Sequence, residues 1–591
     1  MKPEHVLRAP FVAVDTETTG LRVHDGRDSL MGISIAIGSG PVPESSVYLP
    51  VQGTDRPIDP DPWIRAIRDR TGPTLMHHAT FDASVLGVWP QYLIDTQVQA
   101  WLLNENRPTG LKYLGDRYLG ADSSAEAKAL RKLMKGWTLA EAKSAARAEG
   151  LKGKEAEARA RELQAEHGPR EWRELRAEEL AEYARQDAVL TYRLHHYLSN
   201  ASDPVGPGIS PHELERQCRF QRTLWDMIRT GVALDVEGAA KACERAEEEC
   251  RTIEEELGIN PRSVREKARL LYEEWGLEVP NWTPTGLPAT DRATLEMLLP
   301  HTGVELLIRH AHLQKAISAF YRPLLDWPGR VHASFSSCRT VTGRLSCSDP
   351  NLQTIPREDT LGEVRRCFVA APGYRLWEVD LAGAELRVMA NLTRDPTMCQ
   401  ALSEGRDLHG EMAHRVWGPD ATGLHRRAAK AVLFGWTYGA GPRKVATMLP
   451  SRSVDEASRL LEALRWTYPA VAQGLRALQD VAKDQGWVAF PSPWEGRVRR
   501  FLGSDAPVYA AFNNVVQGAV AELMKDVMMN LDLEDIGARL VLQVHDSLVF
   551  EIPDGEADAP DRLRLHLDEV LKDCQPPRWV LPMKWEDKPW L

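Results

Sequence analysis

The sequence predicts a multidomain chain that is α/β at its start, helical in its middle and α+β in its last part. Three observations support this fold class: short apolar runs near the start, a proline- and glycine-rich break near residue 205, and mixed strands and long helices after about residue 330. The 591 residues have room for about three or four domains of ordinary size. We expect domains at 1–204, 205–330 and 331–591.

The elements of the first domain follow in order. FVAVD, MGISIAIG and SSVYLPV predict three strands, and PDPWIRAIRDR predicts a helix. Residues 121–182 are rich in Ala, Glu, Arg and Lys, which predicts solvated helices with charges at i,i+4 spacing. We assign them no further role. SNASDPVGPGISP, residues 199–211, is the clearest linker.

After the linker the pattern is helical. HELERQCRFQRTLWDMIRTG predicts a helix that ends at Gly231, and EGAAKACERAEEECRTIEEEL predicts a second, charged helix. GRVRRF, residues 496–501, is a basic stretch with two open interpretations. It either contacts nucleic acid or forms a solvated basic face.

Composition excludes several classes of protein. Hydrophobic residues are 43% and charged residues 27%, an ordinary globular balance. Eight cysteines without CxxC spacing argue against a zinc site or disulfide framework, so we expect reduced thiols and a cytoplasmic location. No segment approaches the roughly 20 apolar residues of a membrane span. A net charge of −11 argues against a protein that is basic all over, but allows a local basic groove.

A first group of acids begins in VDTETTG. Asp15 and Glu17 are two apart on the predicted strand, so both side chains leave one face and suit a divalent cation. A lone pair of this kind is also common at a solvated strand end. Asp82 follows in HHATFDASVL, and Tyr183 and Asp187 lie four apart on one helix face in YARQDAVLTYRL.

This order of acids resembles the 3′–5′ proofreading exonucleases of the DEDD superfamily, tyrosine subtype. The resemblance implies an RNase H-like domain in which two Mg²⁺ ions, with Mn²⁺ as a substitute, bind a single-stranded 3′ end. The implied metal ligands are Asp15, Glu17, Asp82 and Asp187, and Tyr183 orients the attacking water. One departure is His78, where the family often has Asn four residues before the third acid.

A second group of acids lies in the last part of the chain. LWEVDLAGAELRVMA predicts a strand, a turn and a helix, with Asp380 at the strand end and Glu385 at the helix start. LQVHDSLVFE, residues 542–551, predicts a hairpin with Asp546 at its tip. Asp also favours turns because it bonds its own backbone. The alternative to this turn role is metal binding, because two Asp residues on neighbouring strands could share a pair of metal ions.

Between these acids, LHRRAAKAVLFGWTYGAG predicts a helix with a chemical stripe. Arg426, Lys430, Phe434 and Tyr438 are each four apart, so they drift slowly around one face. Two cations followed by two aromatic rings suit a triphosphate and a base. The alternative is an amphipathic helix with a snorkelling basic edge.

DLAGAELR, RRAAKAVLFGWTYG and VHDS, in this order, resemble the palm and fingers motifs of family A DNA polymerases. TVTGRLSCSDPNLQTIP, residues 340–356, is similar to another signature of that family, as are RDLHGEMAH and NNVVQGAVAE. The resemblance runs from about residue 212 to the end, and with the exonuclease it covers almost the whole chain. It implies a right-hand polymerase fold, with a helical thumb over about 212–330 and palm and fingers after it.

The resemblance also implies roles. Asp380 and Asp546 would hold two Mg²⁺ ions, and Lys430 would also protonate the leaving pyrophosphate. Arg426, Lys430 and His409 would bind the triphosphate of the incoming nucleotide. Phe434 would pack on its sugar, and Tyr438 would stack near the templating base. Glu385 would be the steric gate that rejects a 2′-hydroxyl. The duplex minor groove, where all four base pairs offer acceptors, would be lined by Arg344, Asn351, Gln353, Asn513, Gln517 and His545.

Three departures from the polymerase motifs matter. Leu381-Ala382 follow Asp380, where the family usually has Tyr-Ser, and Tyr509 stands where an Arg is usual. In the last motif Ser547 follows Asp546, where the family usually has Glu. The metal-binding aspartate is present, but its usual acidic neighbour is absent.

The sequence therefore predicts a template-directed DNA polymerase with a proofreading exonuclease, acting on primer-template DNA and dNTPs, with replisome proteins as further partners. One alternative keeps the exonuclease active and reduces the polymerase half to a DNA-binding platform. A second is a non-enzymatic replisome scaffold, which the complete acid sets disfavour. The lack of room for a 5′ nuclease domain favours a phage replicative enzyme in the host cytoplasm. The predicted thumb has no large insertion, so we do not expect a processivity clamp bound there.

Overall fold

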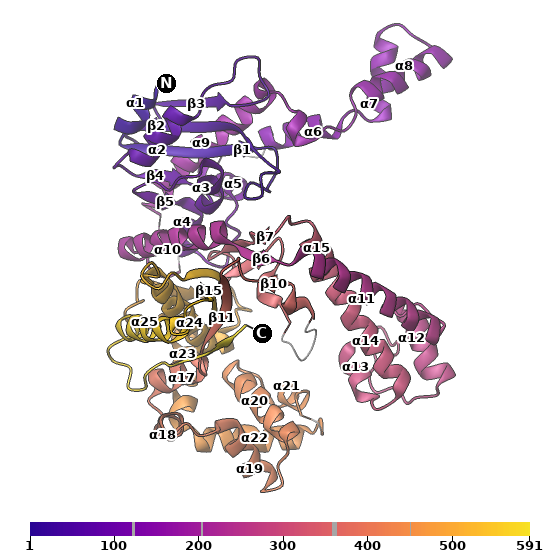
Figure 1. Cartoon of the computed structure of the whole chain (residues 1–591), viewed down its shortest axis with the longest axis vertical. Coiled ribbons are helices and arrows are strands. Elements are labelled where there is room, and N and C mark those ends of the chain that lie inside the picture. Colours follow the sequence, from indigo (N-terminus) through magenta and orange to yellow (C-terminus); the bar gives the residue numbers. More distant parts are fainter. Residues whose placement is uncertain (121–124, 202–204, 357–362, 450, 591) are drawn as a thin grey trace.

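The chain folds into an N-terminal α/β part and a larger C-terminal part that is built on a second sheet (Figure 1). The computed structural model describes residues 1–120, 125–201, 205–356, 363–449 and 451–590. Within these residues no helix is both long enough and apolar enough to cross a bilayer. All eight cysteines are free thiols, as expected.

The N-terminal part has one five-stranded sheet in the order β3-β2-β1-β4-β5, with β1 antiparallel to β2 and parallel to β4. Its strands are β1 (Phe11–Thr18), β2 (Leu30–Gly38), β3 (Ser45–Pro50), β4 (Thr74–Met76) and β5 (Leu93–Asp95). Its helices are α1 (Pro3–Arg8), α2 (Asp61–Asp69), α3 (Ala79–Leu86), α4 (Thr96–Leu103), α5 (Leu111–Leu119) and α9 (Ala177–Leu198). The three predicted strands and the predicted helix are confirmed.

The sheet lies between α9 on one face and α1, α2 and α3 on the other. Ala188 of α9 meets Ala13 and Ala36, and these small side chains bring the helix close to the strands. On the opposite face Val12 packs in a cluster with Trp63 of α2. Because both faces are covered, β1 is apolar until it reaches its acids.

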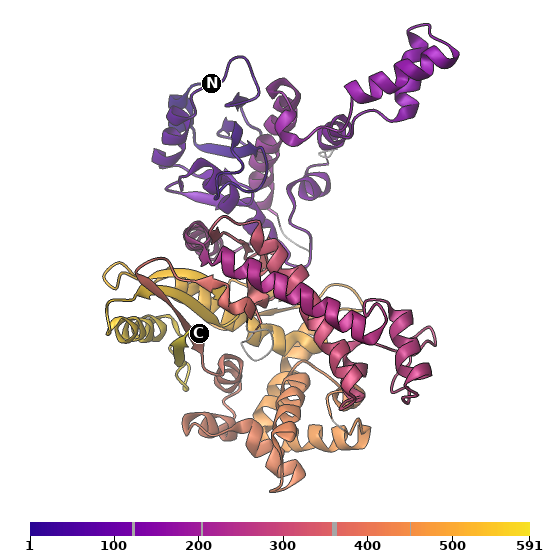
Figure 2. The same cartoon turned by 45° about the vertical axis from the view of Figure 1, so that its right-hand side comes forward.

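Between α5 and α9 the described residues include the helices α6 (Ala125–Lys135), α7 (Leu139–Ala148) and α8 (Gly153–Glu166). Figures 1 and 2 both show α7 and α8 standing clear of the rest of the molecule. The prediction of solvated helices over this stretch is confirmed for the described residues.

The middle of the chain is mostly helical and projects to one side (Figure 2). It contains α10 (Pro211–Thr230), α11 (Val236–Leu257), α12 (Val264–Ala268), α13 (Arg292–Met297), α14 (Thr302–Ala316) and α15 (Arg322–Leu325). A small sheet of β6 (Val232–Leu234), β7 (Arg330–Val331) and β10 (Phe368–Val369) joins it to the last part, and one hydrophobic core runs through both. The domain boundaries at 204 and 330 stay predictions.

The last part is built on the sheet β14-β15-β11-β16. Its elements are β11 (Tyr374–Leu381), α17 (Ala384–Thr393), α24 (Ala511–Met529), β14 (Arg539–Val544), β15 (Ser547–Pro553), α25 (Ala559–Cys574) and β16 (Trp585–Pro589). Val544 pairs with Ser547, so His545 and Asp546 form a two-residue turn. The predicted hairpin is confirmed, and His545 takes the left-handed backbone with a φ of 58°.

A layer of helices lies beyond this sheet, at the end of the molecule opposite the N-terminus (Figures 1 and 2). It contains α18 (Pro396–Ser403), α19 (Leu408–Trp417), α20 (Gly423–Thr437), α21 (Pro442–Ala446) and α22 (Val454–Thr467). The next helix, α23 (Pro469–Gln485), packs against α17 and α24. The short strands β8 (Ser334–Ser336) and β9 (Ser346–Ser348) pair with each other, as do β12 (Trp487–Ala489) and β13 (Val498–Arg500).

Both expectations for the basic stretch 496–501 are wrong. Arg497, Arg499 and Arg500 are only 2%, 4% and 1% exposed. Arg499 and Arg500 form ion pairs with buried Glu105 at 3.0 and 3.1 Å. Arg500 also donates to the carbonyl of Val205, in the linker, at 2.8 Å. The arginines are buried because the linker and the loop after α4 cover β13.

Glu105→Ala should destabilise the protein by about 3–5 kcal/mol, because it leaves two buried guanidinium groups without their carboxylate. Unfolding in urea measures the loss. The matched control is Glu296→Ala, which removes an exposed pair with Arg292 at 2.7 Å and should cost less than about 1 kcal/mol. Equal losses in the two variants would contradict a structural role for Glu105.

Candidate active sites

The first group of acids lies where β1 meets α9. Asp15 and Glu17 come from β1 and Asp187 comes from α9, and one carboxylate oxygen of each lies within 4.8 Å of the other two. Carboxylate oxygens at this spacing suit a hard divalent cation. The fold therefore brings together three of the four ligands that the sequence predicts.

The fourth acid, Asp82, belongs to α3 and is buried beside this group. Its Oδ1 accepts hydrogen bonds from the backbone N–H of Thr16 at 3.1 Å and from the Thr16 hydroxyl at 2.6 Å. Because Thr16 lies between Asp15 and Glu17 on β1, this contact fixes α3 against the strand that carries the other acids.

These acids are held in an unfavourable environment. Burial raises the pKa of Asp15 to about 7. Burial and the neighbouring charge of Asp15 also raise the pKa values of Glu17 and Asp82. Buried like charges repel strongly unless a cation lies among them. The group is therefore built to receive positive charge.

Lys112 of α5 is a residue of this site that sequence reasoning missed. Its ammonium forms an ion pair with Asp187 and lies 4.5 Å from the ring centroid of Tyr183. The same charge lowers the pKa values of Asp15 and Glu17. No motif marks Lys112 in the sequence, since it meets Asp187 only through the packing of α5 on α9.

The second pair of acids meets on the C-terminal sheet. Asp380 of β11 lies opposite Ser547 of β15, so the hairpin turn places Asp546 directly beside the end of β11. The backbone N–H of Leu381 donates to the carbonyl oxygen of Asp546 at 3.0 Å. Burial, and then the charge of Asp546, raise the pKa of Asp380 to about 6.

A further carboxylate lies next to Ser547. Glu378 is two residues before Asp380 on β11, and its Oε1 accepts a hydrogen bond from the Ser547 hydroxyl at 3.4 Å. The same hydroxyl lies close enough to Asp380 to lower its pKa. Glu378 also forms an ion pair with Arg365 at 2.6 Å. The signal was present in WEVD, where two acids share one strand face, but sequence reasoning missed it.

Glu385, at the start of α17, is held from several sides. Its carboxylate forms an ion pair with Arg344 and accepts a hydrogen bond from the Tyr438 hydroxyl at 3.3 Å. Gln517 of α24 donates to the same Tyr438 oxygen at 3.1 Å. His545 lies close enough that Arg344 contributes to lowering its pKa, after burial. Four predicted site residues, Arg344, Glu385, Tyr438 and Gln517, thus form one connected group.

The predicted stripe on α20 is present, although the helix ends at Thr437, one residue before Tyr438. The Phe434 ring lies 6.3 Å from Tyr438 and 6.1 Å from His409. Burial, and then the charge of Lys430, lower the pKa of His409 to about 4. Arg426 forms an ion pair with Asp407 at 2.6 Å.

The remaining predicted DNA contacts differ in exposure. Asn351 is exposed, and Asn513 is half-buried one helical turn before Gln517. Gln353 is buried, and its amide donates to Gln543 of β14 at 2.9 Å. Gln353 thus supports the strand that leads to the hairpin turn.

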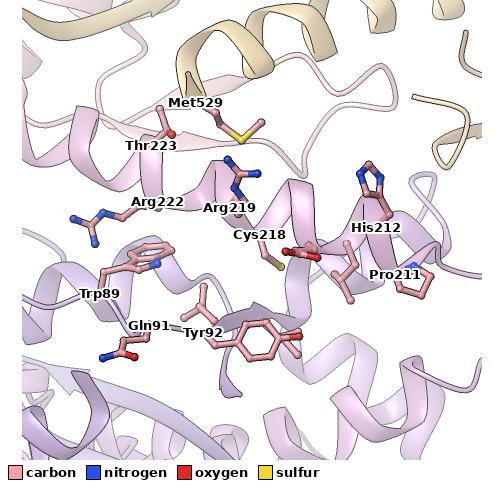
Figure 3. A pocket seen from close by; sticks show the side chains of 14 residues that line it. Trp89, Gln91, Tyr92, Pro211, His212, Cys218, Arg219, Arg222, Thr223 and Met529 are labelled. Atoms are coloured by element: carbon pink, nitrogen blue, oxygen red, sulfur yellow. The ribbon is translucent and has the colours of Figure 1, made fainter. Parts of the chain in front are cut away.

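A cavity of about 820 Å³ lies at the junction of the N-terminal part and α10 (Figure 3). Trp89 and Tyr92 line one side of it, and Arg219 and Arg222 of α10 line the other. None of its lining residues belongs to either group of acids.

Two family models match the chain. Residues 4–203 match the 3′–5′ exonuclease family, and residues 235–575 match DNA polymerase family A. The first match contains Asp15, Glu17, Asp82 and Asp187, and the second contains Asp380 and Asp546.

Curated relatives agree with both models. The chain is 35% identical over 389 residues to the thermostable DNA polymerase I of Thermus aquaticus. This match covers 62% of this chain and 46% of that protein. It is 27% identical over 593 residues to DNA polymerase I of Pseudomonas aeruginosa, covering 92% of this chain and 60% of that protein. The chain spans about half the length of the curated relatives it matches.

A solved structure shares the fold. The polymerase domain of Pol1 from M. smegmatis, in complex with DNA primer-template and dNTP, matches 99% of this chain and 97% of its own, with a TM-score of 0.73 and 24% identity. The predicted fold class is confirmed. The chain therefore belongs to DNA polymerase family A and carries a 3′–5′ exonuclease domain before its polymerase domain.

Proposed function

We propose that the chain copies primed template DNA from dNTPs and removes mispaired 3′ nucleotides at a separate site. The observation that carries this proposal is the meeting of Asp380 and Asp546 at the ends of two neighbouring strands, within the region that matches the polymerase family. The group of Asp15, Glu17 and Asp187 supports the exonuclease in the same way. A role in phage genome replication stays a prediction from the sequence.

Each site is proposed to hold two Mg²⁺ ions, for which Mn²⁺ can substitute. Asp15, Glu17, Asp82 and Asp187 would hold them in the exonuclease, and Asp380 and Asp546 in the polymerase. The donor chemistry fits, because all six groups offer carboxylate oxygens and the buried exonuclease acids carry more negative charge than Lys112 offsets. Bound ions activate the attacking oxygen and stabilise the leaving one during in-line displacement.

In the exonuclease, Tyr183 is proposed to orient the attacking water. Burial raises its pKa, so its hydroxyl keeps its proton at neutral pH and can donate a hydrogen bond. Lys112 competes with a bound cation for Asp187 and keeps α5 close to the acids before one arrives.

In the polymerase, Arg426, Lys430 and His409 are proposed to bind the triphosphate, and Lys430 to protonate the departing pyrophosphate. With a pKa lowered to about 4, His409 is neutral at pH 7 and acts as a hydrogen-bonding group without charge. Arg426 must exchange its pairing with Asp407 for a phosphate.

Nucleotide selection is proposed to depend on Glu385, Phe434 and Tyr438. Arg344 and Tyr438 hold the Glu385 side chain in one position, so it would sterically exclude a 2′-hydroxyl. Phe434 would pack on the sugar and Tyr438 near the templating base. Arg344, Asn351, Asn513, Gln517 and His545 would contact the minor groove, and Gln353 would contribute through Gln543.

A labelled primer on a template tests the whole proposal. With Mg²⁺ and dNTPs the primer should lengthen, and with Mg²⁺ alone it should shorten. A chain that does neither would contradict the proposal.

The two activities should separate genetically, because each site has its own acids. Asp15→Ala with Glu17→Ala should abolish shortening of the primer and leave extension largely intact, and Asp380→Ala should do the reverse. Each change removes metal-binding charge, so losses of orders of magnitude are expected. Shortening at the native rate in the double variant would contradict the exonuclease assignment.

Extension should survive Ser547 in the native chain, because Glu378 supplies a carboxylate on the adjacent strand. Glu378→Gln should slow single-turnover incorporation about 10–100-fold, as loss of an outer carboxylate does. Adding Ser547→Glu to that variant should recover most of the rate. Ser547→Glu alone should change it at most modestly, and Asp546→Ala should abolish it.

A magnesium titration of single-turnover incorporation compares these variants. If the native chain fails to extend while Ser547→Glu does, the polymerase half is a DNA-binding platform and the exonuclease is the active part.

Stabilisation by Mg²⁺ should depend on pH. Below pH 7 folded Asp15 holds a proton that a cation must displace, whereas above pH 7 its charge is free to bind. Without metal, this raised pKa makes the folded state lose stability as pH rises from about 4 through 7. The rise in Tm with Mg²⁺ over EDTA should therefore be larger at pH 8 than at pH 6.

Thermal unfolding of the native chain and of the Asp15→Asn/Glu17→Gln variant checks this. The variant keeps the polymerase acids. It should therefore lose only that part of the pH-dependent rise in Tm with Mg²⁺ that comes from the exonuclease site. An equal rise at both pH values in the native chain would contradict it.

A further inference from the structure

Residues 125–170 form a projection that we call the basic arm. It consists of α6, α7, α8 and the return segment that ends at Arg170. Figures 1 and 2 show it leaving the N-terminal part and ending in the α7–α8 pair, which stands clear of the body. Neither the family motifs nor the proposed chemistry uses it.

The basic arm is a packed unit. Trp137, after α6, donates its backbone N–H to the carbonyl of His167 at 2.8 Å, and the two rings stack with centroids 4.0 Å apart. Arg170 donates its backbone N–H to Met134 at 2.8 Å and forms an ion pair with Glu179 of α9 at 2.8 Å. Both ends of the arm are thus anchored at the exonuclease.

The charge of the basic arm is opposite to that of the whole chain. Residues 125–170 hold 11 Lys or Arg against 7 Asp or Glu, a net charge of +4 in a chain of net charge −11. Four cations on α6 lie at spacings i, i+3, i+4 and i+7, which places them on one helix face. These exposed residues are Lys128, Arg131, Lys132 and Lys135.

The opposite face of α6 packs at the exonuclease site. Leu130 and Met134 join a cluster that includes Met31 and Tyr183. Because Met134 and Tyr183 share this cluster, α6 lies beside the proposed catalytic tyrosine, and the charge of Arg131 also lowers the pKa of Tyr183. The helix that carries the stripe therefore packs beside Tyr183, and after Lys135 the chain turns into α7 and α8 (Figure 1).

We propose that the cationic face of α6 binds the phosphates of single-stranded DNA and guides the strand whose 3′ end enters the exonuclease site. This inference rests on the proposed exonuclease function. Lys128 to Lys135 span about 10 Å of helix, which matches about three stacked nucleotides at roughly 3.4 Å each. Phosphates fit because the contact must serve any sequence, and lysine binds them as a point charge.

The test removes three of these charges with Lys128→Gln, Lys132→Gln and Lys135→Gln. Gln keeps helix propensity, and Arg131 stays because it lies near Tyr183. Hydrolysis of a long single-stranded oligonucleotide is measured across a salt titration. The p-nitrophenyl ester of thymidine 5′-phosphate, too small to reach α6, reports on the acids alone. The matched control, Lys572→Gln/Arg578→Gln/Arg459→Gln, loses equal charge on exposed residues of the C-terminal part.

The arm variant should raise KM for the oligonucleotide roughly tenfold with kcat unchanged. The slope of log affinity against log salt should fall by about 2, the value for three lost phosphate contacts on a single strand. Hydrolysis of the small ester should stay at the native rate, and the control variant should match the native chain throughout.

Unchanged KM and salt slope in the arm variant would overturn the proposal, as would loss of ester hydrolysis, which would indicate a structural role for α6. Failure of the exonuclease function itself gives a different result. The native chain would then hydrolyse neither the ester nor the oligonucleotide.

Discussion

The buried ion pairs of Glu105 with Arg499 and Arg500 hold the two catalytic parts in one arrangement. Burying these charges gains little net stability, since desolvation offsets most of the attraction. Their value lies in specificity, because any other packing of the N-terminal part would leave charges buried and unpaired. Arg497, directly before β13, forms an ion pair with Glu522 of α24. The interface thus also fixes the helix that carries Asn513 and Gln517.

Both acid sites combine a strand with an element from far along the chain, and in both the fold offsets only part of the negative charge. They differ in how that charge is handled. In the exonuclease, Lys112 lies among deeply buried acids and pairs with Asp187. In the polymerase, Asp380 is more accessible, and Ser547 connects it to Glu378. In the first site a bound metal ion would displace the Lys112 ammonium from Asp187. In the second site it would rearrange the hydrogen bond between Ser547 and Glu378.

Positive charge is used in two ways in this acidic chain. The arginines of β13 are buried, because a guanidinium fork can be satisfied by carboxylates and backbone carbonyls at once. The lysines of α6 stay exposed, because an ammonium is strongly hydrated and gains less from burial. Two basic stretches with similar composition thus have different roles: one joins domains, and the other offers a surface to phosphates.

The sequence by itself determined the strands β1, β2 and β11, the hairpin that carries Asp546 and the stripe on α20, because apolar period and turn chemistry are local. It also identified the acids, since short motifs mark them on β1, α3, α9, β11 and the hairpin turn. Only the tertiary structure decided which charges surround them. Lys112 meets Asp187 across 75 residues, Ser547 meets Glu378 across 169, and Arg500 meets Glu105 across 395. No local pattern encodes such pairs, because they arise only when distant segments pack and exclude water.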